Sequence, residues 1–337
     1  AKFVHTVGAG YVVGSMFVVA ISSYYLLAGR FQPFAKRSII VASAFGLAAA
    51  LCVVILGDES GYMDSENQKM KLAAIEGMWQ TEPAPASFNL VGIPDPARRR
   101  VDYSIRIPWV LGIIATRSFT EPVPGIDELV ANNAARIRTG LVAYNALEAL
   151  QKNRSDANAR AQLRDHAADL GYALLLKHYI NDPRKADDAT IAKAAASTVP
   201  DIFTLFWSFR IMVGLGFYFI AFFALLFWDA THRNFSRRWL LRLAIWSLPL
   251  PWVSTELGWV VAEYGRQPWA IDGVLPTFLA ASSVSGAQVI FTLCGFVLLY
   301  SALLVVDVML MRKYIVMGPV KALGLDGAPR LSAVPAE

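Results

Sequence analysis

Five long apolar segments constrain this sequence most strongly, because each is long enough to cross a lipid bilayer as a helix. A spanning helix needs roughly 20 predominantly apolar residues. Only 17% of the 337 residues are charged, whereas soluble domains average about 25%. The sequence therefore predicts an all-α polytopic membrane bundle with five transmembrane helices. These helices are expected at residues 3–28, 38–57, 202–228, 239–264 and 287–311.

The five spans divide the chain into four predicted regions. Residues 1–57 hold the first two helices, 58–200 form a large loop, 201–313 hold the last three helices and 314–337 form a tail. Lys and Arg are frequent in the two short loops on one side and in the tail, so that side is predicted to be cytoplasmic. The large loop, with 17 Lys and Arg against 18 Asp and Glu, then lies outside. The net charge of +5 is therefore explained without nucleic-acid binding.

The large outer loop is predicted to be partly ordered. Residues 127–151 and 157–179 show the apolar periodicity of amphipathic helices that pack together outside the membrane. Residues 81–96 are rich in proline and are predicted to be extended.

Several polar residues are predicted near the outer ends of the spanning helices, where polar groups are costly. At about 1.5 Å of rise per residue, His5, Met212 and Glu263 lie at similar depths. A histidine and a methionine on different helices can bind a haem iron from both sides. Arg210 and Arg266 could each balance a haem propionate. The alternatives are a hydrogen-bonded histidine, a core methionine and a Glu263–Arg266 ion pair that anchors the end of a helix.

Two charged residues in the loop, Lys71 and Glu76, occur in the segment KLAAIE. Their offset of five residues places them about 140° apart on a helix, so they cannot form an i,i+4 pair. They could flank a ligand. The alternative is a solvated helix surface.

Five motifs stand out along the sequence: FVHTVGAGYVVGSMF (3–17), GDESGY (57–62), KLAAIEGMWQTEPAPASF (71–88), FRIMVG (209–214) and WVVAEYGRQPWAI (259–271). Together they resemble subunit I of the cytochrome bd-type quinol oxidases. The resemblance extends over essentially the whole chain, in the variant with a long outer loop, called the Q-loop. It includes the C-terminal five of the nine helices expected for the family, so the N-terminal helices are expected to be missing here.

The resemblance implies a role for each haem-site residue. His5 and Met212 match the axial ligands of the low-spin haem b558, and Arg210 matches a residue close to that haem. Glu263 matches the ligand of the high-spin haem b595. Trp259 matches an aromatic residue between cofactors that takes part in electron transfer. The ligand of the third cofactor, haem d, lies in the family's N-terminal helices and has no counterpart in this sequence.

The resemblance also implies the reaction and its setting. Lys71 and Glu76 match a pair implicated in the oxidation of quinol, either ubiquinol or menaquinol. The implied enzyme is an electrogenic quinol:oxygen oxidoreductase of the bacterial inner membrane, with the Q-loop on the periplasmic side. Its implied partners are subunit II, small single-span subunits and membrane lipid. Two alternatives remain open at this point: a transporter or channel with an outer polar binding layer, and a non-catalytic membrane scaffold.

Overall fold

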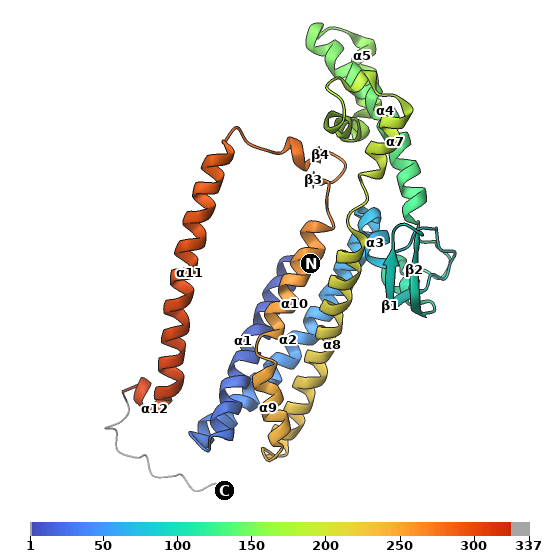
Figure 1. Ribbon diagram of the computed structural model, residues 1–337. Coiled ribbons are helices and arrows are strands. Elements are labelled where there is room, and N and C mark those ends of the chain that lie inside the picture. Colours follow the sequence, from blue (N-terminus) through green and yellow to red (C-terminus); the bar gives the residue numbers. More distant parts are fainter. Residues whose placement is uncertain (1, 325–337) are drawn as a thin grey trace. The chain divides into compact units, whose positions relative to one another are not determined.

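The computed structural model describes residues 2–324 and is mostly helical (Figure 1). The chain separates into two compact units. Among the described residues, the first comprises 2–14, 44–225 and 249–281, and the second comprises 15–43, 226–248 and 282–324. The first unit contains all the site residues predicted from the sequence.

Four helices among the described residues are long and apolar enough to cross a membrane. Each coincides with a predicted span, which confirms the helical membrane fold. The second of them continues about three turns beyond the apolar segment, into the polar residues that precede the large loop. The four helices are α1 (Lys2–Leu27), α2 (Gln32–Asn67), α8 (Ile202–Thr231) and α11 (Gly286–Met317).

The remaining predicted span, residues 239–264, is interrupted. It consists of α9 (Arg238–Trp246), α10 (Leu250–Trp259) and a π-helical turn, η5 (Val260–Tyr264). Pro249 and Pro251 lie at the interruption, and a proline cannot donate the hydrogen bond that a continuing helix requires. The predicted count of five continuous spans is therefore not confirmed.

The large loop between α2 and α8 is ordered along its length. Residues 127–151 were expected to be helical, and α4 confirms this, whereas residues 157–179 form four short helical pieces instead of one helix. A β-hairpin that the sequence did not predict follows; its first strand lies within residues 81–96, which were expected to be extended, and its second strand lies beyond them. The main elements are α3 (Lys69–Glu76), β1 (Phe88–Asp95), β2 (Arg100–Ile107), η1 (Gly112–Thr116), α4 (Ile126–Lys152), α5 (Ala157–His166), η2 (Ala167–Asp169), α6 (Leu170–Leu174), η3 (Leu175–His178), η4 (Pro183–Lys185) and α7 (Asp188–Ala196).

The hairpin and a second small strand pair extend from the helical core of the first unit. β1 pairs antiparallel with β2, with Phe88 opposite Ile107. After η5 the chain forms β3 (Trp269–Ile271), β4 (Leu275–Pro276) and the turn η6 (Thr277–Leu279). The indole of Trp269 is buried in a cluster with residues of α4, α6, η3 and α7. The segment that follows η5 is thereby fixed to the helices of the loop.

A second cluster of buried apolar residues surrounds α3. It joins this short helix to the start of α4, the start of α8 and η5, so the loop shares one core with the ends of the two helical segments next to it. The buried members are Ala73, Ala74, Ile75, Trp79, Ile126, Ile202, Leu205 and Val261.

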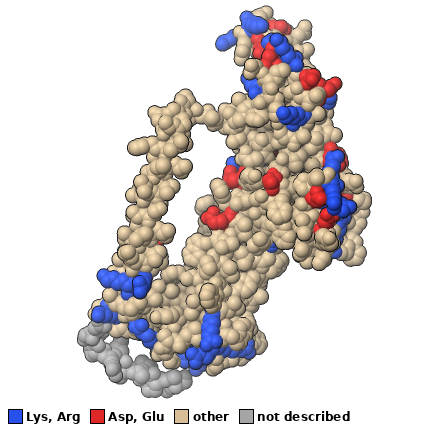
Figure 2. Space-filling view, in the orientation of Figure 1, with Lys and Arg blue, Asp and Glu red and all other residues tan. Residues whose placement is uncertain are grey.

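The second unit carries many of the basic residues. Lys and Arg side chains gather at the helix ends of this unit, while both signs of charge are mixed over the loop of the first unit (Figure 2). The unit also contains the short helix α12 (Pro319–Ala322). Most of the predicted tail, from residue 325 onward, lies outside the described residues.

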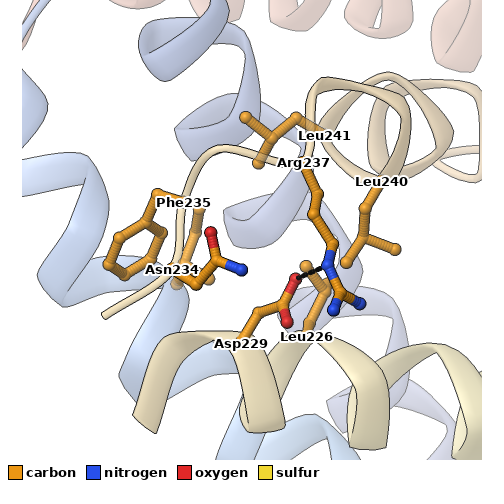
Figure 3. Close-up of a pocket in the computed structure, with 8 residues that line it drawn as sticks. Leu226, Asp229, Asn234, Phe235, Arg237, Leu240 and Leu241 are labelled. Atoms are coloured by element: carbon orange, nitrogen blue, oxygen red, sulfur yellow. Dashed lines mark ion pairs between the residues drawn. The ribbon is translucent and has the colours of Figure 1, made fainter. Parts of the chain in front are cut away.

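The second unit also contains a small pocket (Figure 3). The Asp229 side chain is buried there, and its Oδ2 lies 3.4 Å from Nε of Arg237. None of the site residues predicted from the sequence lines this pocket. The lining residues are Ile39, Leu226, Asp229, Asn234, Phe235, Arg237, Leu240 and Leu241.

Candidate functional site

The short helix α3 positions the two charged residues predicted in the loop. Ala73, Ala74 and Ile75 are all buried in the apolar cluster, and because consecutive residues point in different directions, this helix is covered on more than one side. Lys71 and Glu76 are consequently buried as well, with 4% and 1% of their surface exposed. The alternative of a solvated helix surface is therefore wrong, because tertiary packing covers both sides of this helix.

Glycine ends this helix immediately after Glu76. Gly77 adopts a left-handed conformation with φ of 61°, in which glycine lacks the steric penalty of other residues. The N–H groups of Gly77 and Met78 then bond to the carbonyls of Ala74 and Ala73. The turn directs the following chain toward β1, whose Asn89 returns to contact Glu76.

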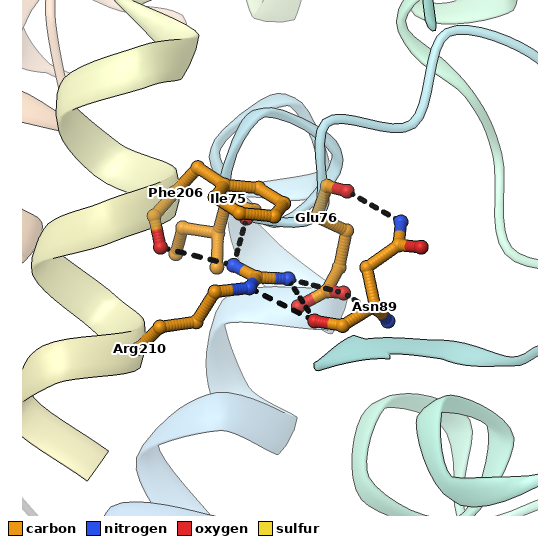
Figure 4. A network of polar contacts seen from close by, with 5 residues as sticks. All are labelled: Ile75, Glu76, Asn89, Phe206 and Arg210. Carbon is orange, nitrogen blue, oxygen red and sulfur yellow. Dashed lines mark hydrogen bonds and ion pairs between the residues drawn. The ribbon is translucent and has the colours of Figure 1, made fainter. Parts of the chain in front are cut away.

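Glu76 lies at the centre of a buried polar network (Figure 4). Its Oε2 lies 3.2 Å from Nη2 of Arg210 on α8 and accepts a hydrogen bond of 3.3 Å from the backbone N–H of Asn89. The Asn89 side-chain amide donates to the Glu76 carbonyl at 2.9 Å. The network therefore ties α3, β1 and α8 together through one carboxylate.

Arg210 fills its remaining donor capacity with main-chain oxygens. Its guanidinium donates to the carbonyls of Ile75, Phe206 and Asn89, with the Ile75 bond at 2.8 Å. It also lies over the Phe206 ring, 3.3 Å from the ring centre. Arginine suits this site because its planar group offers five donors in a fixed geometry. A role of Arg210 beside a haem propionate stays a prediction.

The environment of Glu76 changes its protonation. Burial raises the pKa of the Glu76 carboxyl from its ordinary value of 4.5 to about 7, and the opposing effects of Arg210 and the Asn89 N–H only partly offset it. Burial has this effect because removal from water disfavours the charged form of a carboxyl group. Glu76 can therefore exchange a proton near neutral pH.

Lys71 is held at the opposite side of α3. Its Nζ lies 2.8 Å from Oδ2 of Asp64, in the last turns of α2. Its stem lies against Gly265, where an added Cβ would come within 3.1 Å of the Lys71 Cγ. The loop motif KLAAIE and the motif GRQPW thus meet in space, although almost two hundred residues separate them in sequence.

The two predicted ligands of the low-spin haem lie on α1 and α8. The buried Nδ1 of His5 has no hydrogen-bond partner of ordinary geometry among the described residues, and Cε1 of the ring lies 3.3 Å from where Gly57 would carry a Cβ. The Met212 sulfur lies 3.1 Å from the corresponding position at Gly258 of α10. The His5 ring also lies within reach of the Val53 backbone, so the alternative of a hydrogen-bonded histidine stays open, and the ligand roles of His5 and Met212 stay predictions.

The predicted ligand of the high-spin haem lies in η5. The Glu263 carboxylate forms an ion pair with Arg266 three residues later. This is the helix-anchoring contact that the sequence offered as the alternative to a haem ligand. Both side chains are partly exposed, and Nε of Arg266 is buried without a partner among residues 2–324. Trp259, the last residue of α10, is 64% exposed. These features are compatible with the predicted roles and do not test them.

Haem ligands are supplied singly by separate elements, unlike the ligands of a metal-ion site. Across the described residues, no group of three or more His, Cys, Asp or Glu side chains converges to hold a metal ion. Haem needs only one or two protein ligands for each iron, so the ligand roles of His5, Met212 and Glu263 stay predictions.

The comparison with known proteins decides the family. Residues 1–319 match the family described as cytochrome bd terminal oxidase subunit I. The chain belongs to this family. It is also 41% identical over 319 residues to the cytochrome bd-II ubiquinol oxidase subunit 1 of Escherichia coli (strain K12), a match that spans 94% of this chain and 62% of the relative.

Two further similarities support membership of the cytochrome bd subunit I family. The cytochrome bd ubiquinol oxidase subunit 1 of Bacillus subtilis (strain 168) is 26% identical over 304 residues, which cover 90% of this chain and 53% of the relative. The bd oxidase structure from Geobacillus thermodenitrificans has a TM-score of 0.65 at 20% identity, covers 94% of this chain and 58% of that chain, and shows the shared fold. The chain thus spans between about half and two thirds of these relatives. The transporter alternative finds no support in them.

Two site residues were missed by sequence reasoning. Asn89 lies in a segment expected only to be extended, and nothing in its neighbourhood distinguishes it. Asp64 precedes Lys71 by seven residues, but the two lie on different helices, so helical spacing could not pair them. One feature of the sequence could have indicated Asp64. Residues 58–67 are mostly polar and follow the apolar span directly, with no proline or extended loop between them.

Proposed function

We propose that this chain is the quinol-oxidising, haem-binding subunit of a terminal respiratory oxidase that reduces dioxygen to water. The observation that carries the proposal is the pair of buried charged residues on α3. Lys71 and Glu76 each have a partner of opposite charge on a neighbouring helix. Buried charged groups are costly and mark functional sites when they occur in a cluster. The family membership and the names of the relatives point to the same reaction.

The chemistry of quinol oxidation requires groups of this kind. A quinol that becomes a quinone loses two protons and two electrons, so a proton acceptor must lie at the site. Glu76 serves as that acceptor because the pKa of its carboxyl is about 7, close to the pH at which it works. Lys71 can donate hydrogen bonds to a quinol oxygen and orient the ring. Both known hydrogen-bond partners of the Glu76 carboxylate use Oε2, which leaves Oε1 for the transferred proton.

The cofactor assignments follow the ligand positions. His5 and Met212 would hold the low-spin haem b558, and Glu263 would hold the high-spin haem b595, with Arg266 as a candidate for a propionate. Arg210 would lie close to haem b558, but Glu76 and main-chain oxygens already occupy its donors. A third cofactor, haem d, would take its ligand from outside this sequence. When bound, the haems supply one-electron transfer and the oxygen chemistry. Trp259 would lie between cofactors and aid electron transfer.

The assembly and its location are proposed on the same basis. The oxidase would contain subunit II and small single-span subunits, within the lipid of the bacterial inner membrane. The large loop would face the periplasm, so that protons from quinol are released there and the reaction is electrogenic. The substrate is ubiquinol or menaquinol. The names of the E. coli relative and of one B. subtilis relative favour ubiquinol, whereas another B. subtilis relative is named a putative menaquinol oxidase.

The rate of quinol oxidation should rise with pH through about 7. Glu76 accepts a proton only in its deprotonated form, and burial raises the pKa of this carboxyl to about 7, so the fraction able to act increases across that range. The measurement is kcat/KM for decylubiquinol between pH 5.5 and pH 8.5, in the whole oxidase. In the Glu76→Gln variant the remaining activity should lose this acid limb.

The matched control for this pH profile is Glu66→Gln. Glu66 is an exposed carboxylate that lies in the last turn of α2, two residues from Asp64. Its replacement should leave the midpoint of the profile unchanged. An acid limb that persists at the same pH in Glu76→Gln would assign the proton acceptor to another group.

A further inference from the structure

We propose that Asp64 is a positioning residue for quinol binding, acting through Lys71. The inference rests on the proposed function, since it assigns a second residue to the same site. Asp64 projects from the last turns of α2, and its Oδ2 lies 2.8 Å from the Lys71 Nζ. The Lys71 side chain is 3% exposed and that of Asp64 is 16% exposed. This ion pair therefore lies at the edge of the buried site, and the Lys71 side chain is its more deeply buried member.

The Lys71 ammonium depends on this carboxylate. A buried ammonium group needs a counter-charge and hydrogen-bond acceptors to replace water. Within the described residues, Asp64 is the only acidic side chain in ion-pair contact with Lys71. The carboxyl of Asp272, in the turn between β3 and β4, lies within electrostatic range of Lys71 but forms no ion pair with it.

Two contacts together fix the direction of the Lys71 side chain. Gly265 confines the stem, because an added Cβ there would lie 3.1 Å from Cγ and 3.2 Å from Cε of Lys71. Asp64 holds the ammonium group at the end of that stem. Lys2 also approaches Asp64, at 3.9 Å, but its side chain is 68% exposed and such exposed pairs contribute little.

The consequence for quinol is a preorganised donor. An ammonium group has three N–H donors, and Asp64 occupies one of them, so two remain for the oxygen of a quinol. Without Asp64, the flexible lysine side chain would no longer be held toward the substrate. Loss of such a contact weakens binding in the ground state and the transition state alike, which raises KM while kcat changes little.

The test compares variants of the whole oxidase in its membrane, with decylubiquinol as the varied substrate. Asp64→Asn should raise KM by about 10-fold, as expected for the loss of one charge-assisted hydrogen bond, with kcat within about 2-fold of the original. Asp64→Glu, which keeps the carboxylate, should restore most of the affinity. Glu66→Gln, a neutralised and exposed neighbour on the same turn, should leave KM unchanged.

A double-variant comparison separates this inference from the proposed function. Lys71→Ala should raise KM by at least as much as Asp64→Asn, and adding Asp64→Asn to Lys71→Ala should have no further effect, because the two residues act as one unit. An increase in KM for Lys71→Ala with no change for Asp64→Asn would overturn the inference and leave the proposed function intact. Unchanged KM and kcat for Lys71→Ala itself would overturn both. A fall in thermal stability of Asp64→Asn with unchanged KM would show a purely structural ion pair and overturn the positioning role.

Discussion

Replacing Arg210 with methionine should destabilise the α3 region by about 3–5 kcal/mol and abolish quinol oxidation. Removing one partner of a buried ion pair has this cost because the other group must then stay buried as an uncompensated charge or take up a proton. The guanidinium also donates to the carbonyls of Ile75, Phe206 and Asn89, which would lose their partner at the same time. Hydrogen exchange of the backbone amides in α3 and β1 measures the loss locally.

Two controls isolate the contribution of the buried charge. Arg106→Met removes an arginine from the same loop whose pair with Glu82 is long, at 3.5 Å, and half exposed, so less than about 1 kcal/mol should be lost. Adding Glu76→Gln to Arg210→Met should recover part of the stability, since no buried charge then remains. Equal exchange rates in Arg210→Met and the original protein would show that the network does not hold α3.

The haem assignments predict that two substitutions affect different haems. Glu263→Ala should remove the high-spin b-type haem signal and lower oxygen reduction, while the low-spin signal persists. Met212→Leu keeps the volume of the side chain but removes the thioether, so it should lower the midpoint potential of the low-spin haem or convert it to high spin. Absorption spectra and redox titrations of the purified oxidase measure both.

Each of these two variants is the control for the other. The structure shows why Glu263 needs such a test, because its carboxylate already has a partner in Arg266. If this ion pair only anchors the end of η5, Glu263→Ala should retain every haem and lose stability alone. Full haem occupancy with normal turnover in Glu263→Ala would therefore remove Glu263 from the ligand set.

The membrane helices could be predicted from the sequence because their signal is local. A run of apolar residues contains its own evidence for a span, and α1, α2, α8 and α11 all lie where such runs occur. Pro249 and Pro251 indicated a disturbance between α9 and α10, although the sequence did not show whether these prolines kink the helix or break it. The hairpin of β1 and β2 was missed, since its strands mix polar, apolar and glycine residues without regular alternation.

The site residues could be named from motifs, but their partners could not. Glu76 and Arg210 are 134 residues apart, and their pairing depends on α3 packing against α8. The helical spacing of Lys71 and Glu76 correctly excluded a pair between them, yet it favoured a solvated surface. That inference failed because an eight-residue helix can be covered on several sides by elements distant in sequence.

The role of Glu76 in quinol oxidation is tested most directly by the oxygen uptake of the Glu76→Gln oxidase with two electron sources. Decylubiquinol requires the proton acceptor of the loop, whereas ascorbate with tetramethylphenylenediamine supplies electrons without quinol chemistry. We expect quinol-driven uptake to fall by about 100-fold, as for the loss of a general base, while dye-driven uptake and the haem spectrum persist. Quinol-driven uptake at the original rate, or equal loss with both donors, would contradict the assignment of quinol oxidation to the buried network of Glu76.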